Sequence, residues 1–372
     1  ADRAALAAER KNLAEIPPRP AERGFPNSMP LDRDAAWYAT PEARHLAEVI
    51  VSFQTPGGGW SKNMSMAGEP RKRGQDYAPD NISRYLGPDD FDTPRDREWN
   101  YVSTLDNNAT TTEMRFLARV ATATPGAPGE PYRVSFIRGM HYLLNAQYPN
   151  GGWPQVWPLE GGYHDAITYN DNAVTLAATV LTDAANGTGD CAFVPADLRK
   201  QARAAAAHAL DCILATQILV NGRRTAWAQQ HDPLTLQPVS GRNFEPAALS
   251  SGESADLLVY LMSLPNPSED VQAAVHTGIA WLKSTAISGQ QWTGTRTEGR
   301  HLVAAPGAGP IWSRYYNITT GLPIFGDRDK TIHDDVSELS LERRNGYQWY
   351  SSGPQHALDV YHEWSSTHPL HP

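Results

Sequence analysis

The sequence predicts a mainly α fold, an (α/α) toroid or incomplete α/α barrel of helix pairs with long loops and short strands on one face. Apolar residues recur at helical spacing before and after loops that each contain a tryptophan. A helix, a tryptophan loop and a second helix can bury their apolar faces only by stacking on neighbouring pairs. The uneven spacing of Trp60, Trp153 and Trp227 argues against a regular solenoid and favours a closed or partly closed ring.

Helices are expected on both sides of each tryptophan loop. The helix before the first loop carries Leu46, Val49, Ile50 and Phe53 and ends near Gln54. The helix before the second loop carries Phe136, Met140 and Leu143 and ends at Gln147. The helix before the third loop carries Ala206, Ala209, Leu210 and Ile213 and ends at Gln217. The following helices begin with small polar residues, at 106–113, 170–173 and 251–254. A further helix is indicated by Val271, Val275, Ile279 and Leu282. Beyond residue 285, glycines, prolines and scattered aromatic residues predict loops and short strands.

The expected domain organisation is simple. Residues 1–35 are charged and contain prolines, which predicts an N-terminal arm with a short helix near residues 4–15. Residues 36–372 are expected to form a single domain of helix pairs that carries the functional site. Within this domain, residues 67–100 contain basic and acidic runs, so we interpret them as an insertion that is too polar for the core.

The composition excludes several classes of function. The formal net charge of -9 argues against nucleic acid as a partner. No run of 18 or more apolar residues indicates a membrane span.

The only cysteines, Cys191 and Cys212, can form one disulfide if the protein is exported, and we expect this bond. A chain that begins at Ala1, without methionine, is consistent with a mature form after signal removal.

Two polar loops have the residue types of a calcium site. Asp106 and Asn107 stand just before one expected helix, and Asp171 stands before another. Carboxylate and amide oxygens are the ligands that Ca²⁺ prefers, and partial coordination leaves room for an anionic substrate. The same residues are also ordinary helix caps. Thr110 and Glu113 fit a capping box at the start of the first of these helices.

Cationic side chains form a second candidate group. Arg242 and Arg314 lie in loops bounded by glycine, proline or aromatic residues rather than on polar helix faces. Arginine binds carboxylates through paired hydrogen bonds, so such loops can form a cationic cleft for a polyanion on an acidic protein. Each arginine is otherwise a surface or ion-paired residue. Lys62, directly after the first tryptophan loop, is harder to explain by packing, and the tryptophans either stack on a sugar or wedge between helices.

Eight ordered motifs resemble the pectate lyases of polysaccharide lyase family 10. They are QTPGGGWSKN (54–63), DNNATTTE (106–113), NGGWPQVWPL (150–159), YNDNA (169–173), TAWAQQHD (225–232), SGRNFEPA (240–247), IWSRYYNI (311–318) and ERRNGYQWY (342–350). The resemblance extends over about residues 40–360. It implies an (α/α) toroid, exported from a bacterium to the periplasm or the medium. It also implies cleavage of α-1,4-linked polygalacturonate by calcium-assisted β-elimination to unsaturated oligogalacturonates. We expect a monomer whose partner is this acidic polysaccharide, with no nucleic acid and no membrane.

The resemblance also assigns roles to residues. It places Asp106, Asn107 and Asp171 in the calcium site, Arg242 as the residue that abstracts the proton, and Lys62, Arg223, Arg314, Arg344 and Tyr347 in substrate binding. Arg223 is a departure, because this chain has Asn-Gly-Arg at 221–223 where the family pattern has Asn-Gly-Lys. Arginine and lysine are not equivalent ligands, so the contact made there differs from that of the family.

The implied chemistry is a proton abstraction at C5 of a galacturonate unit, followed by loss of the glycosidic oxygen at C4. Cations on the uronate carboxylate acidify that proton and stabilise the charge that develops in the transition state. Arginine is an unusual base, because its ordinary pKa is about 12.5–13.8. A cleft crowded with cations lowers such a pKa, and an alkaline working pH helps.

Two other classes of function remain open on the residues alone. An inverting glycoside hydrolase on the same toroid would use two of Asp106, Asp171 and Glu245 as acid and base. A non-catalytic carbohydrate-binding protein would use the tryptophan loops and the arginines. Of the three classes, only a lyase makes an unsaturated product that absorbs in the ultraviolet.

Overall fold

The computed structural model of the chain describes residues 2–22 and 29–370. The chain divides into two compact units. The first comprises Ala1–Arg84, Thr93–Ile167 and Ala173–Asp211, and the second comprises Tyr85–Asp92, Thr168–Asn172 and Cys212–Pro372. The division expected from the sequence, an arm at 1–35 and one domain at 36–372, stays a prediction.

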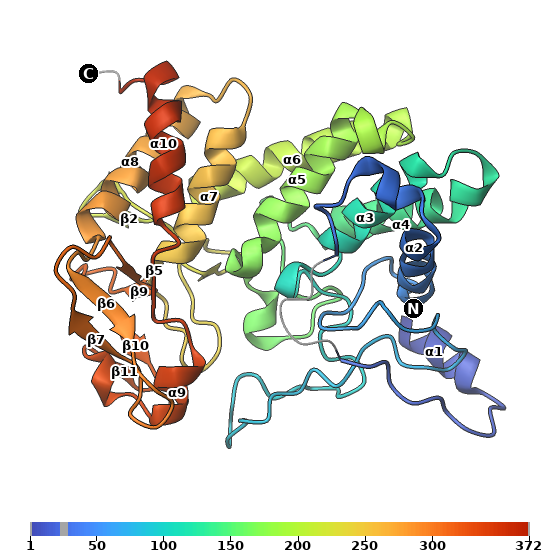
Figure 1. Ribbon diagram of the computed structural model, residues 1–372, viewed down its shortest axis with the longest axis horizontal. Helices are drawn as coiled ribbons and strands as arrows, with labels where there is room; N and C mark the ends of the chain where they lie inside the picture. Colours follow the sequence, from blue (N-terminus) through green and yellow to red (C-terminus); the bar gives the residue numbers. More distant parts are fainter. Residues whose placement is uncertain (1, 23–28, 371–372) are drawn as a thin grey trace. The chain divides into compact units, whose positions relative to one another are not determined.

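The first unit is built mainly of helices (Figure 1). They are α1 (Asp2–Arg10), α2 (Pro41–Phe53), α3 (Thr111–Ala123), α4 (Glu130–Ala146), α5 (Ala173–Asn186) and most of α6 (Ala196–Ala215). Short 3-10 turns are η1 (Ala35–Ala39), η2 (Asp106–Asn108), η3 (Ala127–Gly129), η4 (Gly162–Asp165) and η6 (Gly189–Cys191). Within this unit α3 packs against α2, α4 and α5. Its buried face carries Met114, Phe116, Leu117 and Val120, which accounts for its central place.

The second unit combines helices with very short strands. Its helices are α7 (Ser251–Ser263), α8 (Glu269–Thr285), α9 (Leu341–Gly346) and α10 (Gln355–Thr367), and its 3-10 turns are η5 (Asn170–Asn172) and η7 (Val336–Glu338). Antiparallel pairs are formed by β2 (Leu219–Val220) with β3 (Arg223–Arg224), β5 (Leu249–Ser250) with β9 (Tyr315–Tyr316), β6 (Gln290–Thr293) with β7 (His301–Ala304), β8 (Trp312–Ser313) with β12 (Tyr350–Ser351), and β10 (Phe325–Gly326) with β11 (Ile332–His333). β1 (Ile167–Thr168) spans the unit boundary, and β4 (Gln230–His231) lies in the second unit.

The predicted mainly α class is confirmed, as are the short strands beyond residue 285. The sequence analysis does not anticipate α10, drawn in red in Figure 1, which packs against α7 and α8. Its signal is present in the sequence, because Ala357, Val360, Tyr361 and Trp364 recur at helical spacing. No helix in the described part of the chain combines the length and apolar content that crossing a membrane requires.

The insertion at residues 67–100 is not excluded from the core, and this part of the prediction was wrong. Tyr77, Ala78 and Trp99 are buried together with Leu6 of α1 and Val102. The charged residues around them are paired rather than free: the guanidinium of Arg10 lies 2.8 Å from a carboxylate oxygen of Asp76. Pairing of this kind allows a polar stretch to cover apolar side chains.

Two hydrogen-bonding side chains recur at the ends of successive helices, a glutamine and a buried tryptophan. The glutamine is the first of these anchors. Gln54, just after α2, donates through Nε2 to the carbonyls of Gly58 at 2.7 Å and Ser135 at 2.8 Å. Gln147 after α4 and Gln217 after α6 each donate in the same way to two carbonyls, one in the following loop and one in a later helix. Each glutamine therefore joins its own helix end and loop to the next helix of the series.

Buried indoles supply the second anchor. Trp60, Trp153, Trp227 and Trp312 are all completely buried, and each donates its Nε1–H to a carbonyl near the end of the preceding helix, at 2.7 to 2.8 Å. The acceptors are the carbonyls of Ile50, Leu143, Ile213 and Leu282. The tryptophans are therefore wedges between helices, and the alternative that the loop residues Trp60, Trp153 and Trp227 stack on a sugar is wrong.

The predicted capping box at α3 is only half formed. Thr110 has a φ of 65° and its side chain does not cap the helix. Its hydroxyl instead donates to the carbonyl of Thr104 and accepts from the backbone N–H of Trp60. The reciprocal half is present, because the carboxyl of Glu113 accepts a hydrogen bond from the backbone N–H of Thr110. Thr110 is thus used to fix the first tryptophan loop rather than the helix end.

The predicted disulfide is wrong, because Cys191 and Cys212 are both free and buried. Cys191 lines a small cavity with Arg115, Asp183 and Asp190, and Cys212 packs beside Tyr169. Burial raises the pKa of the Cys191 thiol to about 12 and that of Cys212 to about 11. Each cysteine therefore behaves as a small core residue with an unreactive thiol.

Removal of one glutamine anchor is expected to destabilise the fold. Gln54→Ala leaves the carbonyls of Gly58 and Ser135 without this donor in a buried position, which costs about 2–3 kcal/mol of unfolding free energy. The change is measured as a lowered urea midpoint. The matched control is Gln355→Ala, whose amide bonds only the exposed Asp359 and whose midpoint is expected to stay unchanged. Equal midpoints for the two variants would show that the anchor contributes nothing.

Candidate active site

Each of the four anchoring tryptophans, Trp60, Trp153, Trp227 and Trp312, is followed, two residues later, by a polar side chain that reaches a helix-opening turn. These side chains are Lys62, Gln155, Gln229 and Arg314. Lys62 and Gln155 contact Asp106, Gln229 contacts Asn170, and Arg314 contacts Asn170 and Glu253. The sequence analysis singled out Lys62 and Arg314 but missed the two glutamines. The repeated spacing from tryptophan is the signal that would have found them.

In the first unit, these contacts converge on the buried carboxylate of Asp106. Gln155 donates to its Oδ1 at 2.8 Å, and the ammonium of Lys62 pairs with its Oδ2. The Lys62 ammonium also lies 3.3 Å from the centre of the Tyr101 ring, in a cation–π contact. Asn107, the next residue, donates to Asn63 Oδ1 at 2.8 Å. The structure thus brings Lys62 into contact with Asp106, next to Asn107 in the chain, and the roles assigned to the three residues stay predictions.

The two Asp/Asn turns have the same backbone shape but carry their acid at different positions. Asn107 and Asp171 both have a φ of 51°, and Asn108 and Asn172 have φ values of 62° and 60°. Asn and Asp tolerate this left-handed conformation better than other side chains, which explains their presence in both turns. Asp106 therefore corresponds to Asn170, and Asn107 to Asp171. Asp171 accepts a hydrogen bond from Asn170 Nδ2 at 2.9 Å.

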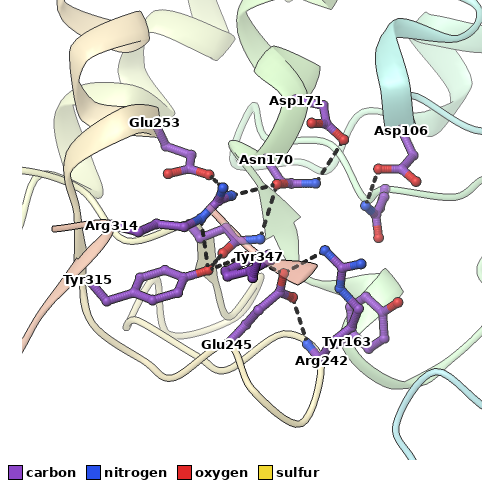
Figure 2. A network of polar contacts seen from close by, with 12 residues as sticks. Asp106, Tyr163, Asn170, Asp171, Arg242, Glu245, Glu253, Arg314, Tyr315 and Tyr347 are labelled. Atoms are coloured by element: carbon purple, nitrogen blue, oxygen red, sulfur yellow. Dashed lines mark hydrogen bonds and ion pairs between the residues drawn. The ribbon is translucent and has the colours of Figure 1, made fainter. Parts of the chain in front are cut away.

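In the second unit, Arg314 forms the first of two arginine–carboxylate pairs. Its guanidinium donates to Glu253 Oε1 at 2.6 Å and to Asn170 Oδ1 at 3.3 Å (Figure 2). It also lies 4.7 Å from the centre of the Tyr347 ring. Burial would lower the pKa of Arg314, but the charge of Glu253 raises it well above the ordinary value. Arg314 is therefore a permanent cation held against the Asn170–Asn172 turn.

Arg242 forms the second pair, on a tight turn of the second unit. Its guanidinium donates to Glu245 Oε1 at 2.6 Å, and its backbone N–H donates to Glu245 Oε2 at 2.9 Å. The Tyr347 hydroxyl donates to the same Glu245 Oε1 at 2.8 Å and contacts the Tyr315 hydroxyl at 2.8 Å. Figure 2 shows that these contacts form one chain of polar groups from Arg242 to Arg314.

Two predicted substrate-binding arginines lie elsewhere in the second unit. Arg223 is exposed on the β2–β3 hairpin, and Arg344 donates to the backbone carbonyls of Ser337 and Glu298. In the described residues, no hydrogen bond or ion pair joins either of them to the chain from Arg242 to Arg314. Arg343, next to Arg344, is buried instead, 4.0 Å from the Phe244 ring centre and 5.2 Å from that of Tyr347.

Glu245 is ionised throughout the working pH range of an enzyme. Burial would raise the pKa of Glu245, but the charge of Arg242 and its hydrogen bonds lower it to about 2. A hydrolase acid must instead hold its proton at neutral pH. Glu245 therefore cannot be the general acid of an inverting glycoside hydrolase, which was one of the alternatives left open by the sequence.

The residues present fit a calcium ion in part. Among the described residues, no group of three or more His, Cys, Asp or Glu side chains is placed to hold a metal. The donor set is instead made of single carboxylates with amide oxygens, which suits Ca²⁺ when a substrate completes the coordination. Gln155 Oε1 is buried beside Asp106 and has no hydrogen-bond partner, so an oxygen acceptor is available there.

Glu113, in the first turn of α3, is a second buried carboxyl of unusual character. Its side chain accepts from the Thr112 hydroxyl at 3.3 Å, and the residue is only 1% exposed. Burial raises the pKa of Glu113 to about 7, because its hydrogen bonds only partly replace the lost hydration. No cation pairs with it in the contacts described, so inside the protein the neutral form is the more stable one below about pH 7.

The family model for pectic acid lyases matches residues 54–358 of the chain. A solved family 10 polysaccharide lyase from Cellvibrio cellulosa is 30% identical, with a TM-score of 0.75 over 92% of this chain and 99% of that one. A point mutant of family 10 polysaccharide lyase from the same organism, in complex with trigalacturonic acid, is 31% identical, with a TM-score of 0.74 over 88% of this chain and 95% of that one. No curated protein matches the chain in sequence.

Helix pairs that carry paired arginines, carboxylates and amide-rich turns on long loops are the framework of a polysaccharide lyase, and the chain is an enzyme of this class. It belongs to the pectic acid lyase family and is a pectate lyase. The resemblance seen in the eight sequence motifs is thereby confirmed.

Glu113 is expected to make stability depend on pH. Its folded-state pKa of about 7 lies above the unfolded value of 4.5, so its contribution is fully present below 4.5 and is lost as the pH rises through 7. Relative to Glu113→Gln, the wild type should therefore lose about 3 kcal/mol of unfolding free energy between about pH 5 and pH 8. Urea unfolding at both pH values measures this difference. Exposed Glu363→Gln is the control, and a Glu113→Gln protein with the wild-type pH dependence would contradict the assignment.

Proposed function

We propose that this pectate lyase cleaves polygalacturonate by β-elimination, with Arg242 as the group that takes the proton from C5. The observation that carries the proposal is the Arg242 guanidinium, held at one-third side-chain exposure on a rigid turn, while its partner Glu245 is almost completely buried. A cation that is both ordered and accessible can meet a uronate unit. The complex of a related lyase with trigalacturonic acid supports an acidic oligosaccharide as the substrate here.

In this mechanism Arg314 and Tyr347 orient the substrate. Arg314 offers a guanidinium that Glu253 holds in place, and such a planar donor binds a carboxylate with defined geometry. Arg242, in its neutral form, accepts the proton from C5, a C4–C5 double bond forms, and the bond from C4 to the glycosidic oxygen breaks. The leaving oxygen takes up a proton from the solvent and becomes the new chain end. The ring that lost the proton is the unsaturated, ultraviolet-absorbing product. Lys62, Arg223 and Arg344 remain proposed substrate contacts.

Calcium is the proposed cofactor, with oxygen ligands from Asp106 and Asn107 in one turn and from Asp171 in the other. When bound, it supplies positive charge that neutralises the uronate carboxylate and so acidifies the proton at C5. The charges of the candidate residues support a role for an added cation. Lys62, Arg242 and Arg314 are each already paired with a carboxylate, so these residues alone offer a polyanion little net positive charge.

The finer features of the protein are also proposals. We propose that the helix pairs follow one another around an (α/α) toroid. The repeated glutamine and tryptophan anchors support this proposal, because each joins one helix to the next part of the chain. The family and the bacterial source of the related structures support export from a bacterium. That the enzyme acts as a monomer stays a proposal. One assay tests the activity: polygalacturonate is incubated with and without a calcium chelator. Ultraviolet absorbance that rises only without the chelator is expected. Reducing ends without absorbance would indicate a hydrolase.

The role of Arg242 is tested by two substitutions. If it is the base, Arg242→Ala lowers kcat about 10²–10⁴-fold. Arg242→Lys should fail almost as badly, because lysine cannot reproduce the planar guanidinium held by Glu245. Steady-state kinetics on polygalacturonate, with folding checked by circular dichroism, measures both. An Arg242→Lys enzyme with nearly normal kcat and a raised KM would instead make Arg242 a substrate contact.

Calcium affinity is expected to depend more on Asp171 than on Asp106. Lys62 already pairs with Asp106, so the Asp106 carboxylate shares its charge with a cation of the protein. We expect Asp171→Ala to weaken calcium binding on the order of 10–100-fold, the size seen even for indirect metal contacts. Isothermal titration calorimetry of the folded variants measures it. The control is Asp359→Ala on exposed α10, and wild-type titration curves for both turn variants would refute the metal assignment.

A further inference from the structure

We infer that Glu245 is a positioning residue that orients the Arg242 guanidinium and, through its charge, sets the pH range in which Arg242 can act. This inference rests on the proposed function, because it concerns the group proposed as the base. It goes further in assigning the control of that base to one carboxylate, which neither touches the substrate nor exchanges a proton.

The first argument is the way in which Glu245 closes its turn. Its backbone N–H donates to the carbonyl of Arg242 at 2.8 Å, and its own carbonyl accepts from Gly241 N–H at 3.0 Å. The side chain then returns to the same turn, since Oε2 accepts from the backbone N–H of Arg242. A Cβ at Gly241 would lie 2.6 Å from this Oε2, so only glycine leaves room for the carboxylate. One oxygen of Glu245 therefore holds the backbone of Arg242.

The second argument is the position of the other oxygen. Oε1 accepts from the Arg242 guanidinium at 2.6 Å and from the Tyr347 hydroxyl at 2.8 Å. Two donors on one buried oxygen define the direction in which the guanidinium extends, because a shift of Arg242 breaks a charge-assisted hydrogen bond. Glu245 is 2% exposed, whereas Arg242 reaches toward solvent. The carboxylate is therefore a fixed support and the guanidinium its accessible end.

The third argument concerns charge. A carboxylate in contact with a guanidinium favours the protonated form, so Glu245 opposes the loss of the proton that a base requires. Other charged or titratable groups near this pair are Arg314, Arg343, Tyr347 and Tyr315. The acids Glu253 and Glu342, paired with Arg314 and Arg328, act on these groups in turn. The positive charges of Arg314 and Arg343 favour the neutral form of Arg242 and so oppose the effect of Glu245. The phenols of Tyr347 and Tyr315 are neutral because burial raises their pKa. Glu245 is thus an anion in direct contact with the Arg242 guanidinium, and its removal should make neutral Arg242 easier to form.

The fold supplies a matched control. Glu253 pairs with Arg314 at 2.6 Å, the same distance that separates Glu245 from Arg242. Both glutamates are buried and both substitutions to glutamine remove one negative charge while keeping the side-chain shape. They differ in which arginine loses its partner. A general effect of charge in the second unit would appear in both variants, whereas control of Arg242 should appear mainly in one.

The experiment records kcat and kcat/KM on polygalacturonate from about pH 7 to pH 10.5 for wild type, Glu245→Gln and Glu253→Gln. For Glu245→Gln we expect the rise of kcat with pH to level off about 1–3 pH units lower than in wild type, the range of a lost neighbouring charge. Its maximal kcat should fall about 10²-fold, since the guanidinium is no longer held. Glu253→Gln should mainly raise KM and keep the wild-type pH profile.

Identical pH profiles for wild type and Glu245→Gln would overturn the inference, as would equal shifts in the two glutamine variants. If Glu245→Gln does not fold, Glu245→Asp replaces it. This variant keeps the charge but withdraws the carboxylate by one methylene, so kcat should fall with the pH profile unchanged. An unchanged kcat would overturn the positioning role. Failure of the proposed function is distinguishable, because it appears as an active Arg242→Lys enzyme.

Discussion

The hydrogen bond from a buried indole to the end of the preceding helix is the constraint on which the site depends. It occurs at Trp60, Trp153, Trp227 and Trp312, each time with the ring fully buried. In such a position, a lost partner leaves a donor and a carbonyl unsatisfied in the core, so the loop cannot slide along the helix end. The hydrogen bond of the tryptophan therefore also fixes the position of the polar residue that follows it by two places, although this residue lies outside the helices and strands.

Ion pairs explain how an acidic chain keeps the cations that we propose as substrate contacts ordered. Lys62, Arg242 and Arg314 each contact one carboxylate that is more deeply buried than the cation itself. A buried pair of this kind contributes little net stability, because desolvation offsets much of the attraction. Its value lies in geometry, since a side chain with many rotamers is held in one orientation before the substrate arrives.

The two Asp/Asn turns show how one backbone device serves different side-chain chemistry. Both use consecutive residues with positive φ, and both stand just before a helix. The acid occupies the first position in one turn and the second in the other, and the partners differ accordingly. Asp106 contacts Lys62 and Gln155, whereas Asp171 contacts Asn170. The equivalence of Asp106 and Asp171 suggested by their similar loops before helices is therefore an equivalence of turns and not of positions.

Local patterns in the sequence determined the helices, the tryptophan loops, the family and the identity of the principal charged residues. Helical spacing and short motifs depend on neighbouring residues, so they can be recognised before the chain is folded. Contacts between distant segments could not be recognised in this way. The pairing of Tyr347 with Glu245, the burial of Arg343 rather than Arg344, and the free state of Cys191 and Cys212 depend on side chains brought together by packing. Thr110 shows the same limit: its motif specified a helix cap, but the tertiary structure uses its hydroxyl to hold the backbone of Trp60, because a buried N–H must find a partner.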